Sequence, residues 1–372
     1  MSGLGRQQRV TVGFEYQFPA IRGIQAGREY YVSMCPMRLL PKIFLFDEEE
    51  LVPELRAQRL INRSRLPELT RYITQNPGNY VFSAITVSID AAVRFDSITD
   101  KGDASRIGML RVPMSAKFII NDGQHRRAAM EKALRERPEL GDETIAVVFF
   151  LDMGLERCQQ MFADLNRYAI RPSRSLSILY DNRDDAAQLT KALVAGSSVF
   201  KDVVELEKTS LSARSRRLFT LSALYSATVE LLSGREKEDP QELAELATEF
   251  WETVAAAFDE WQRVRSGDLS AGEVRMDFIH THGVVLQAIG RLGNALISRY
   301  PKQWRTKLGK LGRINWRRNN SALWEGRALS GGRLSKAGRS VVLTANALKQ
   351  HFRLPLSEEE QHLEDAFNRG QT

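Results

Sequence analysis

The chain of 372 residues is 43% hydrophobic and 27% charged and has a formal net charge of +7, as expected of a soluble protein long enough for two domains. No apolar run approaches the roughly 20 residues that cross a bilayer, and the N-terminus lacks the apolar region of a signal peptide, so we expect a cytoplasmic protein without a membrane partner. Its two cysteines, Cys35 and Cys158, lack the spacing of a zinc site and are too few for a disulfide framework.

The N-terminal region is expected to combine strands with interrupted helices. Residues 1 to about 17 are polar and irregular, which predicts a loosely held arm. The residues that follow predict strands at 18–23, 30–34 and 38–46. Helices are predicted over residues 48–75, interrupted at Pro53 and Pro67.

A second group of strands follows these helices. Apolar residues in alternation or in short runs predict strands at 80–89, 107–112, 118–121 and 145–151. A helix that starts near Gln124 lies between the last two strands in sequence. This order predicts a strand-helix-strand unit within a mixed sheet.

The pentapeptide DGQHR, residues 122–126, lies where the strand gives way to this helix. Asp122 can cap the helix, and Gly123 accepts the backbone angles of a tight turn. Residues 124–127 then fall in the first helical turn, where cations are disfavoured because the free backbone N–H groups are already electropositive. Basic side chains here indicate a bound anion such as phosphate, which Arg126 and Arg127 would grip. The alternatives are solvated arginines at an ordinary helix start, or an internal pair between Arg126 and Asp122.

A further helix is predicted over residues 154–166 and ends in the sequence FADLNR, residues 162–167. The three-residue spacing of Phe162 and Leu165 turns both inward and leaves Asn166 and Arg167 near the helix exit. On spacing alone, a C-cap asparagine followed by a surface arginine explains these two residues as well as a functional role does.

From Ser173 onward the pattern becomes mostly helical. Asp239 and Pro240 mark a helix start, with the aspartate as cap and the proline at the first position. The apolar residues that follow recur at helical spacing up to Trp261, which predicts a core-facing stripe. His280 and His282 are one residue apart, but at a helix start they point in different directions, so we predict no metal site.

A basic segment occupies residues 302–353, with 13 Lys or Arg and one acid, Glu325. Its balance of +12 leaves −5 for the rest of the chain, so the positive charge is concentrated on one surface, as in proteins that bind a polyanion. Interleaved glycines, aromatic residues and arginines favour a nucleic-acid interface in which tryptophan and asparagine supply stacking and hydrogen bonds. The alternative is an irregular solvated loop with buried tryptophans. The predicted DNA-binding residues are Arg313, Arg317, Arg318, Arg327, Arg333, Lys336 and Arg339.

Three stretches carry a resemblance to known families: residues 18–23, 122–126 and 162–167. The pentapeptide resembles the signature of the DGQHR-domain proteins and the phosphate-gripping turn of the ParB and sulfiredoxin superfamily. Together with the basic C-terminal third, the three stretches resemble the DndB family of DNA sulfur modification (phosphorothioation) proteins over nearly the whole chain.

The resemblance implies an α+β fold: a ParB-like mixed-sheet α/β domain over residues 1–205, followed by a mostly helical domain over residues 206–372 with a basic DNA-binding surface. It implies a bacterial transcriptional repressor that binds double-stranded DNA at the promoter of the phosphorothioation gene cluster. Other DNA sulfur modification proteins, and a second copy of the chain, are the further expected partners. Because similar proteins share the 162–167 stretch, Asn166 and Arg167 are expected to form a second wall of the pocket opposite Asp122 and Arg126.

The resemblance also leaves an enzymatic alternative, because DGQHR proteins and their ParB relatives include nucleotide-binding and hydrolysing members. In an NTPase that takes ATP or another NTP with Mg, the catalytic residues would be Asp122, Gln124, His125 and Arg126. The phosphate-binding residues would be Gly123, Arg126, Arg127, Asn166 and Arg167. A ParB-like enzyme that nicks DNA is the third possibility.

Overall fold

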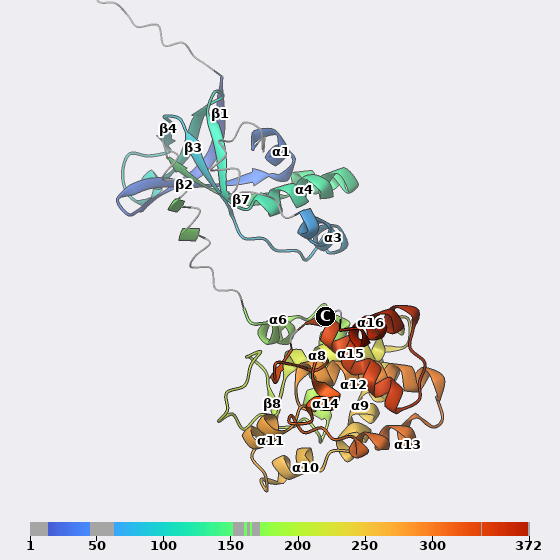
Figure 1. The fold of residues 1–372 in the computed structure, drawn as a ribbon. Coiled ribbons are helices and arrows are strands. Elements are labelled where there is room, and N and C mark those ends of the chain that lie inside the picture. Colours follow the sequence, from blue (N-terminus) through green and yellow to red (C-terminus); the bar gives the residue numbers. More distant parts are fainter. Residues whose placement is uncertain are drawn as a thin grey trace, which may run out of the picture. The chain divides into compact units, whose positions relative to one another are not determined.

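The computed structural model describes residues 14–44, 63–151, 160–161, 164–165, 172–335 and 337–370. The chain divides into two compact units, residues 1–170 and 171–372. Each unit has its own hydrophobic core. The mixed sheet of the first unit and the helices of the second confirm an α+β fold (Figure 1).

The first unit is built on a seven-stranded sheet in the order β4-β5-β1-β2-β7-β3-β6. All strand pairs are antiparallel except β3 with β7, so the sheet is mixed as predicted. The predicted strand-helix-strand unit consists of β6, α4 and β7. Its two strands are not neighbours in the sheet, because β3 lies between them. The strands are β1 Glu15–Gln25, β2 Arg28–Pro36, β3 Ile85–Asp90, β4 Arg94–Ser97, β5 Ile107–Pro113, β6 Lys117–Asp122 and β7 Thr144–Leu151.

Helices cover one face of this sheet, where Figure 1 shows α1, α3 and α4 on the same side. The strands place alternate apolar residues on that face, among them Phe18 of β1 and Phe149 of β7, whose rings are 5.1 Å apart. Ala129, Met130 and Ala133 of α4 are buried against the same core. The helices are α1 Leu40–Ile43, α3 Leu66–Gln75 and α4 Gln124–Glu136, with 3-10 turns at Met37–Leu39, Arg63–Arg65, Asp103–Arg106 and Pro138–Asp142.

Several predicted elements of this unit differ from the structure. The strand predicted at 38–46 is wrong over its described residues, because Met37–Leu39 and α1 are helical there and turn Leu40 and Phe44 into the core. The strand predicted at 80–89 begins only at Ile85, and β4 was not predicted. Pro67 lies in the first turn of α3, which its fixed φ suits, and most of the helical stretch predicted before it lies outside the described residues. Most of the predicted N-terminal arm lies outside the described residues, and so does Pro53.

The second unit is mostly helical, as predicted. Its helices are α6 Arg174–Tyr180, α7 Asp185–Gly196, α8 Leu221–Leu232, α9 Pro240–Ala256, α10 Asp259–Ser266, α11 Ala271–Asp277, α12 Gly283–Arg299, α13 Trp304–Leu308, α14 Ser321–Trp324, α15 Gly338–His351 and α16 Glu358–Asn368. A 3-10 turn at Gly309–Arg313 and two short strand pairs complete it: β8 Val204–Glu205 with β9 Phe219–Thr220, and β10 Leu329–Ser330 with β11 Arg333–Leu334.

The helices of this unit start and pack largely as their sequence patterns predict. Asp239 caps α9 by accepting hydrogen bonds from the backbone N–H groups of Gln241 and Glu242, and Ser357 caps α16 with a capping box. The apolar stripe of α9 is buried, with Phe250 and Trp251 fully enclosed beside the buried face of α12. Among the described helices, none has both the length and the apolar character needed to cross a membrane.

The division between the units falls after residue 170, whereas the sequence placed the boundary near residue 205. The intervening helices α6 and α7 contribute Ile178, Ala187 and Leu193 to the core of the second unit. Ser175 of α6 is buried, and its Oγ lies within hydrogen-bond distance, 3.1 Å, of Oγ of Ser222 on α8. Residues 172–205 therefore pack with the helical unit.

Candidate nucleic-acid interface

The DGQHR turn joins β6 to α4 at Gly123. Gly123 has φ +106° and forms the N-cap of α4 without a side-chain cap, so the predicted capping role of Asp122 is wrong. A Cβ atom at Gly123 would lie 3.1 Å from Cγ1 of Ile85 on the neighbouring strand. Both the backbone angle and this close approach require glycine at the turn.

Arg126 is bonded to the protein itself. Its Nη2 donates to Oδ2 of Asp122 at 2.5 Å, while Nη1 donates to the carbonyls of Ser83 and Ala84 at 2.8 and 3.1 Å and to the hydroxyl of Ser83. The side chain is 14% exposed. The structure thus shows the internal pair with Asp122 that the sequence offered as an alternative to an anion site.

The other polar residues of the turn also face protein groups. Gln124 is buried, and its Nε2 donates to the carbonyl of Ile120 at 3.0 Å. Arg127 is buried and pairs with Glu131 one helical turn away at 2.9 Å. His125 is half-buried. Its burial is the main cause that lowers its pKa, the charge of Arg65 lowers the pKa further, and the charge of Asp122 opposes both effects.

The second wall predicted for this site falls on Asn166 and Arg167, which lie outside the described residues. Of the neighbouring stretch, Met161 is described and its Sδ lies 3.1 Å from Nδ2 of Asn121. The same Nδ2 donates to Oγ of Ser88 at 2.7 Å, and both Asn121 and Ser88 are fully buried. The residue before the DGQHR turn is therefore anchored to β3.

The basic segment, residues 302–353, has exposed cations that the DGQHR turn lacks. Six of its cations are exposed and form no ion pair with an acid in the described part of the chain: Lys302, Lys310, Arg313, Arg317, Arg333 and Arg353. Arg318 and Arg339 are half-buried, and Lys336 lies outside the described residues. The exposed cations keep their charge available to an external polyanion.

Arg327 does not belong to this exposed set. Its guanidinium is buried, forms two hydrogen bonds with Glu364 of α16 at 3.0 and 2.5 Å, and donates to the carbonyl of Leu343 at 2.7 Å. The ring of Phe367 lies 4.4 Å from its Cζ. With its donors engaged in the interior, Arg327 serves packing, and we remove it from the predicted DNA-binding set.

The tryptophans of the segment are buried as well. Trp316 stacks on Trp324 with ring centroids 5.1 Å apart, and the two indole N–H groups donate to the carbonyls of Leu311 and Asn315. Both side chains are at most 4% exposed. The predicted stacking of these tryptophans on bases is therefore replaced by stacking within the protein.

Glu325, the one acid of the segment, stabilises a turn. Its carboxylate oxygens accept hydrogen bonds from the backbone N–H groups of Gly331 and Gly332 at 2.5 and 3.2 Å. These glycines have φ +57° and +71° and form the two-residue turn between β10 and β11. Arg333 follows this turn and has no acidic partner among the described residues.

The two histidines at 280 and 282 are used in packing. Nδ1 of His280 accepts a hydrogen bond from Nε1 of Trp261 at 2.9 Å, and Nε2 of His282 lies 2.9 Å from the carbonyl of Arg275. Burial lowers the pKa of His280 to about 3. Among the described residues, no cluster of three or more His, Cys, Asp or Glu could hold a metal ion.

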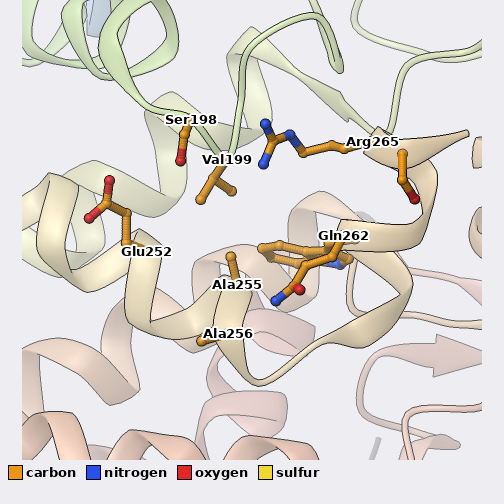
Figure 2. Close-up of a pocket in the computed structure, with 9 residues that line it drawn as sticks. Ser198, Val199, Glu252, Ala255, Ala256, Gln262 and Arg265 are labelled. Carbon is orange, nitrogen blue, oxygen red and sulfur yellow. The ribbon is translucent and has the colours of Figure 1, made fainter.

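Figure 2 shows a pocket of about 610 Å³ in the second unit that the sequence did not indicate. Val199, Ala255 and Trp261 supply apolar lining. Glu252 and Arg265 stand on opposite sides of it (Figure 2). Their opposite charges leave the rim close to neutral, so this pocket does not extend the basic surface.

Comparison with known proteins gives one match. A family model described as DndB: DNA-sulfur modification-associated matches residues 18–355. No curated protein and no solved structure matches the chain. The family match extends from β1 to the residues after α15, and it includes both the DGQHR turn and the basic segment.

Proposed function

The chain belongs to the DndB family of DNA-sulfur modification-associated proteins, and we propose that it is a DNA-binding transcriptional repressor of the phosphorothioate-modification genes. In this role it binds double-stranded DNA at their promoter, while partner proteins of the system carry out the sulfur chemistry. The observation that carries the proposal is the group of six exposed cations in the basic segment, which have no acidic partners in the described part of the chain. Such a group neutralises phosphates and releases their counterions.

The geometry of the short strands supports this use of the segment. Arg317 lies opposite Phe278 in an isolated antiparallel bridge, with its Cζ 4.9 Å from the phenyl ring. Arg333 follows the glycine turn that Glu325 holds. Cations on restrained backbone lose less conformational freedom when they bind a phosphate than cations on a flexible tail.

The internal hydrogen bonds of the DGQHR turn favour a structural role for this turn. Asp122, Gln124 and Arg126 would have to bind or activate an NTP in the NTPase alternative, and a ParB-like nicking enzyme would rely on the same turn. Instead, Arg126 binds Asp122 and the residues before β3, and Gln124 binds the carbonyl of Ile120 on β6. We therefore propose DNA binding by the helical unit, with the turn stabilising the sheet unit.

The test is a salt titration of DNA binding by the full chain. Arg313, Arg317 and Arg333 are replaced together by alanine, and the logarithm of the binding constant is measured against that of the salt concentration. We expect the slope to fall by about 0.9 for each phosphate that is no longer neutralised, both on a promoter duplex and on a scrambled duplex of equal length. The control replaces two exposed cations outside the basic segment, Lys237 and Arg369, by alanine.

An unchanged slope in the triple variant would remove the basic segment from the interface. Repression needs its own measurement, namely the output of a reporter gene behind the promoter of the modification genes. We expect the wild-type chain to lower this output and the triple variant to lower it less. A reporter that does not respond to the wild-type chain would overturn the repressor assignment, even with DNA binding intact.

A further inference from the structure

A second basic stretch lies about a hundred residues before the first. The ten residues from Lys208 to Arg217, which we name the 208–217 loop, contain four cations and no acid. Lys208, Arg214 and Arg216 are exposed. The loop also contains four serine or threonine residues, whose hydroxyl groups are common phosphate ligands in DNA complexes.

The backbone of the 208–217 loop is bound by a buried arginine. Arg275 of α11 is 8% exposed and donates to the carbonyls of Ser212 and Ser215 at 2.7 and 3.1 Å, and to those of Ala213 and Arg217. Four backbone carbonyls of the loop thus meet one guanidinium. With these carbonyls turned inward, the loop backbone is fixed beneath the exposed side chains of Arg214 and Arg216.

The helix α11 approaches the loop more closely than a side chain would permit. A Cβ atom at Gly272 would lie 2.3 Å from the carbonyl oxygen of Ala213, so only glycine fits without a shift of the backbone. On the other side of the loop, Ser175 of α6 donates to the carbonyl of Lys208 at 2.9 Å. The loop is therefore anchored at both ends.

The C-terminal end of α11 contacts the backbone of the basic segment. The backbone N–H of Arg318 donates to the carbonyl of Asp277, the last residue of α11, at 2.8 Å, and Arg317 pairs with Phe278. Arg275 and Asp277 are two residues apart, which corresponds to roughly 3 Å along a helix. The 208–217 loop and residues 317–318 thus flank one short helix, which is labelled α11 in Figure 1.

The electrostatics of His282 agree with this placement. Burial, together with the nearby charges of Arg318 and Arg275, lowers its pKa to about 4 against the opposing effect of the hydrogen bond to the Arg275 carbonyl. Two acids, Glu273 and Asp277, lie on α11 between the cations. Glu273 accepts a hydrogen bond in the capping box with Ser270, which holds its carboxylate at the start of the helix, and Asp277 is exposed at the helix end.

We propose that the 208–217 loop is a second phosphate-binding element, which contacts the DNA backbone through Lys208, Arg214 and Arg216 beside Arg317 of the basic segment. This inference rests on the proposed DNA-binding function and adds a site to it. Arg275 acts as a positioning residue that holds the loop in register with the basic segment. The ligand is the phosphodiester backbone, so the contacts are independent of base sequence.

The experiment compares three variants of the full chain in the salt titration: Arg214→Ala with Arg216→Ala, Arg313→Ala with Arg317→Ala, and the control Lys237→Ala with Arg369→Ala. Each removes two exposed charges. We expect each of the first two variants to lower the slope by about 1.8, equally on promoter and scrambled duplexes, and the control to retain the wild-type slope. Thermal unfolding should be unchanged for the loop variant and the control, since the replaced side chains are exposed, and at most slightly lowered for Arg313→Ala with Arg317→Ala, which also loses the contact with Phe278.

A further variant combines Arg214→Glu with Arg216→Glu, and we expect its repulsion of phosphate to weaken DNA binding beyond the loss seen with alanine. A wild-type slope in the loop variants, with a lowered slope for Arg313→Ala and Arg317→Ala, would overturn the second element and leave the proposed function standing. A wild-type chain that does not bind DNA in a salt-dependent way would overturn both.

Discussion

Arg126 illustrates how a cation is accommodated in the first turn of a helix. The free N–H groups of α4 disfavour a positive charge there. The structure offsets this cost with the carboxylate of Asp122 and with the carbonyls of Ser83 and Ala84. The result is a bond between the DGQHR turn and the residues just before β3, and it places Arg126 among the groups that hold the sheet unit together.

Arg126→Ala should therefore lower the stability of the sheet unit. We expect a loss of about 2–3 kcal/mol in the free energy of unfolding, because charge-assisted hydrogen bonds disappear and the acceptors beside β3 lose their donor. DNA affinity and its salt slope should remain those of the wild type. Denaturant unfolding and the salt titration measure the two quantities.

Arg135→Ala is the matched control for this substitution. Arg135 lies on the same helix and pairs with Glu131, but its side chain is 74% exposed, so its loss should change stability by less than about 1 kcal/mol. An Arg126→Ala protein with wild-type stability and weakened DNA or nucleotide binding would restore the anion site at the turn.

At the level of elements, the junction of β6 and α4 depends on one glycine. Gly123 combines a positive φ with a backbone that lies against Ile85 of β3. The turn therefore has little room to relax, since β3 is enclosed between β7 and β6 in the sheet.

Gly123→Ala should destabilise the sheet unit by about 1–3 kcal/mol, the cost of a strained backbone angle for a residue with a side chain. Gly78→Ala is the control, because Gly78 lies in an exposed turn with no atom within 4 Å of the added Cβ. Chemical denaturation of the two variants gives the comparison. Equal stability of both would show that the turn relaxes without cost.

At the scale of the whole molecule, the two units have separate hydrophobic cores. The buried apolar clusters contain residues 18–149 in one unit and 178–354 in the other, with no member in common. All the cations assigned to DNA lie in the second unit. On the proposed function, the sheet unit is thus not required for the phosphate contacts.

A fragment of residues 171–372 should fold and bind DNA with the salt slope of the full chain. A fragment that begins at residue 206, at the boundary predicted from the sequence, should be less stable because it lacks α6 and α7 and their packing against α8. Circular dichroism and the salt titration compare the two fragments. A folded 171–372 fragment with a clearly lower slope would assign phosphate binding to the sheet unit.

The sequence by itself determined the elements whose signals are local. Strands β1, β2, β5, β6 and β7, the start of α4 near Gln124 and the cap of α9 at Asp239 were all predicted from alternation or capping residues. These signals depend on neighbours a few residues apart, and such interactions are present in the chain before it folds. The charge balance of the basic segment and the family resemblance are likewise properties of the sequence.

Only the tertiary structure decided which charged groups face solvent. Arg327 and Arg333 look alike in sequence, yet Arg327 is buried against Glu364 of α16, whereas Arg333 follows an exposed glycine turn. Arg126 likewise finds its partners at Ser83 and Ala84, some forty residues earlier. Ion pairs and burial of this kind form between elements that are distant in sequence, so their partners are set by the packing of those elements and by no local pattern.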